Sequence, residues 1–412
     1  MDIIIWGTGK FGSWAYDLLR EYNITGYVDS APEIVGTKFK DFIVWSKEEL
    51  IDKYNGEVVV ITPRGFEAEI GKWLDEKKIF NHYAFEEELW GLHAFIKQVN
   101  KTKLLEDIKK DSSWILYPKS LLSLVVEKWL SSNKKEVQIV DNVLETENAN
   151  LIITKLLSPT QKETIEGKKI LDYSNLSLRD DLFYYPELSA FKDICKGQRC
   201  FIVATGPSLK IEDLDTLKNN NEKCFGVNGI LFAFDKTAWR PNYYCISDHN
   251  GLFMWLDKIL SMNVNDKFVS DLGWMPELFD RKKEFHKWHF KSEWIRGVKP
   301  KFNVDITHGL YWARTVVCDI CIPLAIYMGF KEIYLLGTDC THDKDPDKRH
   351  FVANYDRGKV SKAQRLEIDE IMLSYQVAKE YADEHDIKIY NATRGGALEV
   401  FPRVDFDSLF VQ

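Results

Sequence analysis

The stretch from Phe201 to Lys210, FIVATGPSLK, constrains the C-terminal half of this chain more than any other. It opens with an apolar run typical of a buried parallel strand. Gly206 then lets the backbone turn and another group approach it, and Pro207 has the fixed φ angle of a first helical residue. A strand that ends at such a turn and opens a helix directs N–H groups at one point, which is a common way to bind phosphate. A tight strand-to-helix connection without a ligand is an equally good interpretation.

The composition indicates a globular protein with more than one domain. The chain has 412 residues, of which 45% are hydrophobic, enough for sizeable cores. Its formal charge of −8, without a long basic run, argues against nucleic acid as the main partner. Because the chain starts with a predicted strand and has no apolar run of about 18 residues, we expect a cytoplasmic protein without a signal peptide or membrane span. The seven cysteines are scattered, and we interpret the closest pair, Cys318 and Cys321, as buried thiols rather than metal ligands.

Residues 1–95 contain a glycine motif typical of a Rossmann-like domain. An apolar run leads into Gly7, Gly9 and Gly12 with the spacing G-x-G-x-x-G, and a helical pattern follows. A second predicted strand ends at Asp29, near the place where an acidic residue contacts the ribose in dinucleotide sites. We therefore predict a small doubly wound domain in which these four residues bind a nucleotide. The stretch also resembles the nucleotide-binding modules of bacterial sugar-modifying enzymes, which hold a nucleotide or nucleotide-sugar or have lost their ligand.

The signals in residues 96–195 are weaker. Ala94–Lys110 and Leu121–Trp129 have apolar residues at helical spacing, and Val137–Val140 and Leu151–Thr154 could be short strands. We find no catalytic spacing here and predict a mainly helical segment that joins two α/β domains. A linker, an element that makes a homo-oligomer and an acceptor-binding insert are the roles that remain open.

Several strands predicted after residue 195 end in small or polar residues. The residues that follow the apolar runs are Gly206-Pro207-Ser208, Asn228, Asp248, Gly337-Thr338-Asp339 and Asn391. Because the carboxyl ends of parallel strands meet at one edge of a sheet, we predict a second doubly wound domain over 196–412 with a ligand site at this edge. The small and amide residues of this set are candidate binding residues, although a turn-forming role is an equally good interpretation of Asn228.

Two further segments add candidates to this site. His308 and Gly309 precede the apolar pattern of a buried helix, so we expect them to form its N-terminus and a second anion-binding end. The charged stretch after Asp339 contains His342 and His350. A loop histidine is usually solvated, but one placed shortly after a strand-end carboxylate is a candidate general base, and we assign this role to His350. The neighbouring side chains expected to stabilise a leaving phosphate are Arg349, Tyr355 and Arg357.

These motifs together resemble known families. In chain order they are GPSL, VNGILF, HGLYWA, LAIYMGFKEIYLLGTD, a charged loop with RHF, and IKIYNATRGGALEVF. The set resembles the bacterial CMP-sialic-acid-dependent sialyltransferases. It resembles even more closely the domain shared by the motility-accessory-factor (Maf) flagellin glycosyltransferases and the archaeal 6-hydroxymethylpterin diphosphokinase (MptE)-like proteins. The resemblance covers about 196–404.

The resemblance implies a CMP-sugar at the sheet edge. Gly206, Pro207 and Ser208 would lie near its phosphate and Asn228 near the nucleotide, and His350 matches the catalytic base of the sialyltransferases. Two departures leave the identity of the donor open. His308 stands where those transferases have a serine. The residues Ser247-Asp248 and 391–396 match the motifs of the diphosphokinase-like proteins rather than those of the sialyltransferases.

We therefore expect an inverting glycosyltransferase that moves a nonulosonic (sialic-acid-like) sugar from its CMP ester to a hydroxyl of a glycan or protein. His350 would be the base, with Asp248 or Asp339 as the next candidates, and no cofactor is required. The alternative is Mg²⁺-dependent pyrophosphoryl transfer from ATP to a hydroxymethyl group, with Asp248 and Asp339 holding the ion. The sequence contains no G-x-x-x-x-G-K-[ST], which argues against a P-loop kinase. A non-catalytic nucleotide-sugar-binding protein is the third hypothesis.

Overall fold

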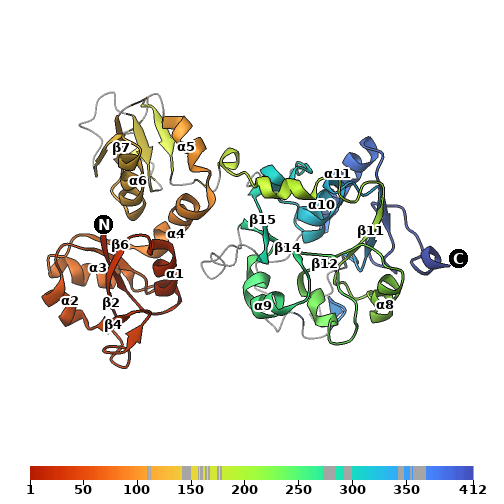
Figure 1. Ribbon diagram of the computed structural model, residues 1–412, viewed down its shortest axis with the longest axis horizontal. Helices are drawn as coiled ribbons and strands as arrows, with labels where there is room; N and C mark the ends of the chain where they lie inside the picture. Colours follow the sequence, from red (N-terminus) through yellow and green to blue (C-terminus); the bar gives the residue numbers. More distant parts are fainter. Residues whose placement is uncertain are drawn as a thin grey trace. The chain divides into compact units, whose positions relative to one another are not determined.

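The computed structural model shows an α/β protein, which confirms the predicted class (Figure 1). The residues that it describes are 1–108, 111, 113–141, 150–155, 157, 161–162, 165, 168–173, 176, 179–271, 284–291, 299–341, 348–352, 355 and 368–411. They form two compact units, Met1–Leu182 and Phe183–Gln412. Among these residues, no helix has the length and apolar character needed to cross a membrane.

The first sheet has six strands in the order β3-β4-β2-β1-β5-β6, parallel except at the short β3. Its strands are β1 (Asp2–Trp6), β2 (Asn23–Val28), β3 (Lys38–Phe39), β4 (Phe42–Trp45), β5 (Val58–Ile61) and β6 (His82–Ala84). The helices that connect or follow them are α1 (Lys10–Leu19), α2 (Lys47–Lys53), α3 (Glu67–Glu76) and α4 (Phe85–His93). The strand order reverses between β1 and β5, as it does in doubly wound sheets.

The middle of the chain forms a sheet of its own and differs here from the expected mainly helical segment. Its four parallel strands have the order β10-β9-β7-β8. The elements are η1 (Ala94–Gln98), α5 (Lys101–Ile108), β7 (Ser113–Tyr117), α6 (Leu121–Ser132), β8 (Glu136–Ile139), β9 (Leu151–Ile153), β10 (Ile170–Asp172) and η3 (Asp180–Leu182). The helix expected over Leu121–Trp129 and the two possible strands, now β8 and β9, are confirmed. The helix expected over Ala94–Lys110 is divided into η1 and α5, and its last two residues lie outside the described part of the chain. The two strands that were not expected are β7, with the sequence SWILY, and β10, with the sequence ILD.

A carboxylate from α4 closes the amino end of α6. Glu88 is 6% exposed, and its Oε2 accepts a hydrogen bond from the Leu122 N–H at 2.8 Å. Burial raises the pKa of this carboxyl, and the backbone N–H groups of α6 act against the rise. The donors at a helix N-terminus, which elsewhere bind anions, are thus partly used by the chain itself.

The second unit is built on seven parallel strands in the order β15-β14-β13-β12-β11-β18-β19. These strands are β11 (Arg199–Val203), β12 (Cys224–Val227), β13 (Tyr243–Ile246), β14 (Asp266–Ser270), β15 (His286–Trp288), β18 (Glu332–Leu336) and β19 (Lys388–Asn391). A parallel ribbon is made by β16 (Phe290–Lys291) and β17 (Leu310–Tyr311). The helices are η4 (Pro186–Phe191), α8 (Ile211–Asn219), η5 (Asn228–Ala233), α9 (His249–Ser261), η8 (Ile306–His308), η9 (Val317–Cys321), α10 (Ile322–Tyr327), α11 (Ile368–Glu384) and η11 (Asp407–Phe410). The order reverses between β11 and β18, and ligands of such sheets bind at the carboxyl ends of the strands next to the reversal.

The helix formed by η9 and α10 belongs to the core of the second unit. Its apolar residues, from Val317 to Leu324, pack in the same cluster as β11, β12 and β18, which confirms the predicted buried helix. Cys318 and Cys321 lie in this cluster as free thiols, and burial raises the pKa of both. The interpretation of this pair as buried thiols is confirmed.

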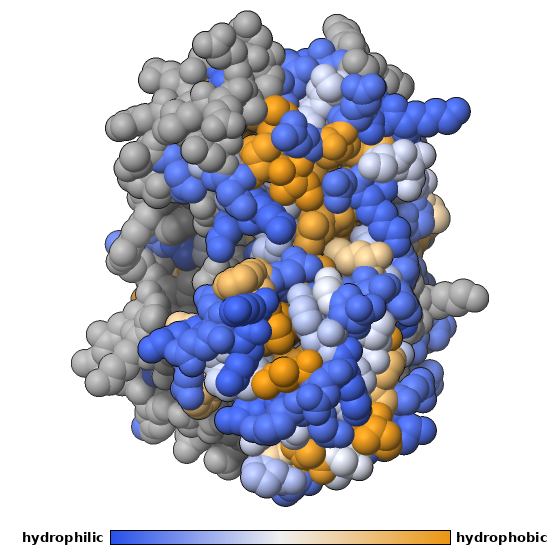
Figure 2. Space-filling model, turned by 90° about the vertical axis from the view of Figure 1, so that its left-hand side faces the viewer, coloured by the Kyte–Doolittle hydropathy of each residue, from blue (hydrophilic) through white to orange (hydrophobic). Residues whose placement is uncertain are grey.

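Figure 2 shows one face of the first unit, on which hydrophilic side chains predominate and hydrophobic ones lie between them. Among the described residues of this unit, the exposed large hydrophobic side chains are Ile43, Ile51, Phe66, Phe80 and Ile170. Scattered apolar groups of this kind are usual on the surfaces of globular proteins.

Candidate functional site

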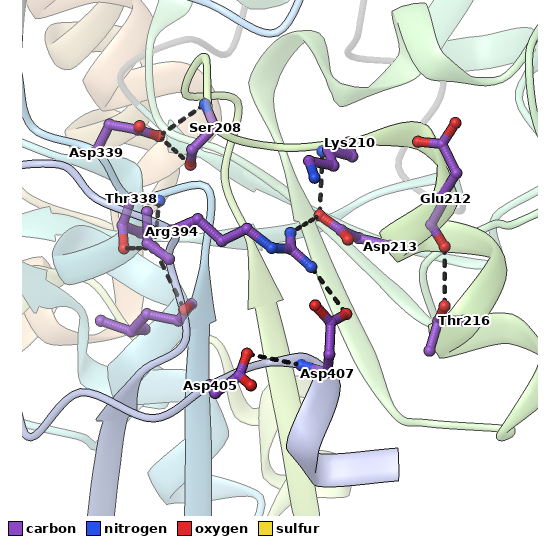
Figure 3. Close-up of polar contacts among 12 residues, drawn as sticks. Ser208, Lys210, Glu212, Asp213, Thr216, Thr338, Asp339, Arg394, Asp405 and Asp407 are labelled. Atoms are coloured by element: carbon purple, nitrogen blue, oxygen red, sulfur yellow. Dashed lines mark hydrogen bonds and ion pairs between the residues drawn. The ribbon is translucent and has the colours of Figure 1, made fainter. Parts of the chain in front are cut away.

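The glycine turn after β11 lies against the end of β18 (Figure 3). The Gly206 N–H donates to the Gly337 carbonyl at 2.8 Å, and Ser208 Oγ donates to Asp339 Oδ2 at 2.8 Å. A β-carbon on Gly206 would lie 2.0 Å from Asp339 Oδ2, so a larger residue would push the two strand ends apart. The structure therefore brings Gly206, Ser208, Gly337 and Asp339 together at the point where the strand order reverses.

This turn does not open the following helix. Pro207 belongs to a separate turn, and α8 begins only at Ile211. The Lys210 N–H donates to Asp213 Oδ2 of the same helix at 3.1 Å. The expectation that Pro207 is a first helical residue is wrong, because a turn of its own precedes the helix and the helix caps itself with Asp213.

Asp339 uses the donors of the glycine turn. Its side chain is almost buried, with 6% exposure, and burial raises the pKa of its carboxyl, while the hydroxyl and N–H of Ser208 act against the rise. Its carbonyl accepts from the Ala397 N–H at 2.7 Å, which fixes its main chain. Thr338, beside it, donates its N–H to Thr393 Oγ1 at 3.0 Å, at the end of β19. The Ser208 groups that were expected to bind a phosphate are thus bonded to Asp339 in this structure.

The segment after β18 returns to the end of β11. The Phe351 N–H donates to the Thr205 carbonyl at 3.1 Å, and His350 Nδ1 lies 3.4 Å from Thr205 Oγ1. The His350 ring stacks on Tyr355, with 3.7 Å between the ring centroids. The Tyr355 hydroxyl accepts from the Gly229 N–H at 2.8 Å. The predicted base and Tyr355 therefore lie at the carboxyl ends of β11 and β12.

Asn228, directly after β12, has an amide oxygen that is buried and without a hydrogen-bond partner in the described part of the chain. Its backbone is in the left-handed region, with a φ of +46°, and its carbonyl accepts from the Tyr244 hydroxyl at 2.8 Å. Since buried polar atoms are nearly always bonded, the amide oxygen is a candidate acceptor for an N–H or O–H group of a ligand.

Asp248 lies apart from these residues. It is exposed, and its Oδ2 accepts from the Gly251 N–H at 2.8 Å in the first turn of α9. Two strands, β12 and β11, separate β13 from β18. With about 4.8 Å between neighbouring strands, the end that carries Asp248 is about 14 Å from the end that carries Asp339. Mg²⁺ needs ligands at about 2.0–2.1 Å, so these two carboxylates do not fit one shared ion in this arrangement.

His308 and Gly309 do not begin the buried helix. They follow each other at the end of η8, and the helix starts eight residues later, with η9 at Val317. Gly309 has a φ of +86°, and a β-carbon there would lie 2.8 Å from the carbonyl oxygen of His289. Directly after it, β17 pairs with β16. The expected anion-binding end is therefore wrong, because β17 lies between His308 and the start of the buried helix.

Of the cations expected to stabilise a leaving phosphate, Arg349 is partly exposed and precedes His350. Arg357 and the alternative histidine His342 lie outside the described residues.

Two polar side chains near the site were not predicted from the sequence. Asp319 of η9 is 2% exposed and accepts from Ser247 Oγ at 2.8 Å and from the Ala313 N–H at 2.7 Å. Burial raises its pKa to about 7, while both hydrogen bonds act against the rise. The sequence signal that could have identified Asp319 is a single aspartate within an apolar helical run. The second feature is Arg394, which reaches from the loop after β19 to Asp213 at 2.7 Å (Figure 3). These two residues are 181 positions apart, and no local pattern reveals such a pair.

The glycine motif of the first unit has Rossmann-like geometry. Gly7 has a φ of +112°, and a β-carbon on Gly12 would lie 2.0 Å from the Gly7 carbonyl oxygen. A β-carbon on Gly9 would meet no described atom within 4 Å. Thr8 donates its N–H and its hydroxyl to Asp29 Oδ2 at 2.9 and 2.7 Å. Asp29 therefore orders the loop, and the backbone at Gly9 is open to a ligand.

Comparisons with known proteins add the following. Residues 1–83 match the family described as C2185-like, N-terminal. Among solved structures, a Maf glycosyltransferase from Magnetospirillum magneticum AMB-1 is similar, with 12% identity and a TM-score of 0.36. The match covers 86% of this chain and 55% of that one, so the chain spans about half of that protein. No curated protein matches the sequence. Residues 177–345 match the family described as 6-hydroxymethylpterin diphosphokinase MptE-like, which agrees with the resemblance of the motifs in this part of the chain.

Proposed function

We propose that the second unit is a glycosyltransferase that transfers a nonulosonic sugar from a CMP-activated donor to a hydroxyl of a glycan or protein. The observation that carries this proposal is the meeting of the glycine turn, Asn228 and His350 at the carboxyl ends of β11 and β12. This edge adjoins the reversal of the strand order, where nucleotides bind in related sheets.

The reaction follows from this arrangement. His350 takes the proton of the acceptor hydroxyl while the acceptor oxygen forms its bond to the anomeric carbon. The bond from this carbon to the phosphate oxygen breaks, its electron pair stays on CMP, and the configuration inverts. The hydroxyl and N–H of Ser208, once released from Asp339, stabilise the charge on the departing phosphate, with Arg349 as the nearby cation. The amide oxygen of Asn228 accepts a hydrogen bond from the nucleotide.

The second candidate is pyrophosphoryl transfer from ATP to a hydroxymethyl group, and the family description of residues 177–345 favours it. Phosphoryl transfer of this kind relies on Mg²⁺ bound to the phosphates. Asp248 and Asp339 are too far apart to hold such an ion together, so Asp339 would need ligands other than Asp248. For this reason glycosyl transfer is the better supported of the two.

In the first unit, we propose that a nucleotide or nucleotide-sugar binds at Gly9, where the backbone is open. Its phosphate would face the amino end of α1. Binding of labelled nucleotides to wild type and Gly9→Val tests this site independently of the second unit.

The experiment that tests the function offers CMP-activated sialic, pseudaminic and legionaminic acids, and ATP with hydroxymethylpterin, each with and without EDTA. We expect turnover of a CMP-sugar that survives EDTA and is reduced in Ser208→Ala but not in the control Ser261→Ala, whose side chain is exposed on α9. Turnover of ATP alone, abolished by EDTA, would support the second candidate instead. Binding of CMP-sugars without any turnover would indicate a non-catalytic binding protein.

A further inference from the structure

We propose that Thr205 and Tyr355 are positioning residues that hold the imidazole of His350 in one orientation and one tautomer, with Nε2 as the proton acceptor. The inference rests on the proposed function, because it takes His350 as the base. It assigns Tyr355 a task other than the phosphate contact expected from the sequence.

Tyr355 is fixed on several sides. It is 6% exposed, and its hydroxyl is held by the Gly229 N–H at 2.8 Å. A β-carbon on Gly229 would lie 2.3 Å from the Tyr355 ring, so the glycine makes room for the tyrosine. Trp255 and Phe232 pack edge-on against the ring, with centroid distances of 5.4 and 5.8 Å. A ring fixed in this way offers a rigid surface to its next neighbour.

That neighbour is the His350 imidazole. The two rings are nearly parallel, with an interplanar angle of 16° and 3.7 Å between their centroids. The main chain after His350 is also fixed, since the Phe351 N–H donates to the Thr205 carbonyl. Stacking and backbone pairing together limit the imidazole to a narrow range of orientations.

Thr205 determines the tautomer. Its hydroxyl donates to the Tyr355 hydroxyl at 3.4 Å, and His350 Nδ1 lies 3.4 Å from the same oxygen. A threonine hydroxyl has one proton, so once this proton is given to Tyr355 the oxygen can only accept from His350. The hydrogen of the neutral imidazole is then on Nδ1, and the lone pair is on Nε2.

The same contacts suit the charge that develops during the reaction. When Nε2 takes the proton of the acceptor hydroxyl, the imidazole becomes a cation that lies over the face of Tyr355, an attractive arrangement. Among the described residues, Lys348 and Arg349 are the charged neighbours of His350 on the same segment, and Asp339 follows the end of β18. All three are unchanged in the variants below, so differences between variants report on Thr205 and Tyr355.

Two matched pairs of variants test the proposal. Thr205→Ser keeps the hydroxyl, whereas Thr205→Val keeps the shape without it. Tyr355→Phe keeps the ring, whereas Tyr355→Leu removes it. The measurements are kcat and KM with a CMP-sugar and the ¹⁵N signals of His350, assigned with His350→Gln among the nine histidines.

We expect Thr205→Val to lower kcat by about tenfold or more, less than the roughly 10²- to 10⁴-fold of removing the base itself. Its KM should stay unchanged and its His350 signals should show mixed tautomers, while Thr205→Ser resembles wild type. Tyr355→Leu should lower kcat, because the imidazole loses the ring that fixes its orientation. Tyr355→Phe keeps this ring but removes the acceptor of the Thr205 proton, so its His350 signals should show mixed tautomers and its kcat should fall as well.

Equal behaviour of Thr205→Val and Thr205→Ser, in an enzyme that turns over CMP-sugars, would overturn the positioning role and leave the proposed function standing. If the wild type turns over no donor, the proposed function fails. The tautomer signals still decide the arrangement without substrate, and a His350 hydrogen on Nε2 in the wild type would overturn it. If Thr205→Val does not fold, the His350 signals of Tyr355→Phe and Tyr355→Leu provide the same test.

Discussion

Asp339→Asn should tighten the binding of CMP to the second unit. In the wild type, the hydroxyl and N–H of Ser208 are bonded to the Asp339 carboxylate. A phosphate that binds at this turn must displace that carboxylate from Ser208, and it is repelled by the negative charge of the carboxylate. The amide of the variant has the same shape and can still accept from Ser208. Because it is neutral, a phosphate should displace it from Ser208 more easily.

The size of the effect follows from the geometry. The carboxylate oxygen is 2.8 Å from Ser208 Oγ. A phosphate oxygen bonded to the same turn would lie about 4–5 Å from that carboxylate. Two unit charges at this distance repel by about 3–4 kcal/mol at an effective dielectric constant of about 20, and salt and solvent reduce this to about 1–2 kcal/mol. We therefore expect CMP to bind about 5- to 30-fold more tightly to the variant at pH 8.

Titration calorimetry with CMP at pH 8 and at successively lower pH measures this difference. Because burial raises the pKa of Asp339, the wild-type carboxyl takes up protons as the pH falls, and the two affinities should converge. Asp257→Asn, an exposed position on α9, controls for net charge and should resemble wild type at every pH. Weaker or equal binding to Asp339→Asn at pH 8 would refute the reasoning and indicate that the carboxylate contributes to binding.

Three further predictions concern separate parts of the chain. His350→Ala should lower turnover of the CMP-sugar by roughly 10²- to 10⁴-fold and leave CMP binding unchanged, and an inactive His308→Ala beside an active His350→Ala would move the base elsewhere. Burial raises the pKa of Asp319 to about 7, so the native state holds an extra proton between about pH 4 and 7 and the free energy of unfolding falls as the pH rises through this range. In Asp319→Asn, the decrease in the free energy of unfolding between about pH 4 and 7 should be smaller by up to about 4 kcal/mol. Denaturant unfolding at both ends of this range measures the difference. In the first unit, Gly12→Ala should cost about 1–3 kcal/mol of stability, because its β-carbon would meet the Gly7 carbonyl at 2.0 Å. Gly9→Ala should cost less than about 1 kcal/mol in the same unfolding experiment, and equal losses would contradict the packing argument.

The strands next to the site were predictable because their signals are local. Buried parallel strands such as β11 and β18 are apolar after a first charged residue, and Gly206 and Gly337 follow within three residues and mark their ends. Because parallel strands end at the same edge of a sheet, Gly206 and Asp339 lie at one edge, irrespective of the conformation of the loops between the strands. The two glycine motifs, one in each unit, could be found for the same reason.

The features that were missed depend on contacts that are distant in the sequence or contrary to the usual pattern. His308 was placed at a helix N-terminus because the apolar spacing extends back towards it, whereas the pairing of β17 with β16 decides its position. Arg394 meets Asp213 only after folding. Asp319 and Glu88 are acidic residues that become buried, one in an apolar helix and the other in the charged run Glu86–Glu88, where solvent exposure is the usual expectation.

The position of Glu88 has a consequence for how this chain could exchange parts with other proteins during evolution. The N-terminal family match ends at residue 83, five positions before the carboxylate that the amino end of α6 needs. A recombination boundary at that match would leave Glu88 and Leu122 on the same side, so the hydrogen bond between them would be kept. A boundary between α4 and α6 would separate them, and an unsatisfied buried N–H at Leu122 would cost about 1–3 kcal/mol. Met1–Leu182 contains the donor and the acceptor together. Homologues that have acquired a different first sheet should therefore retain the acceptor at the position of Glu88.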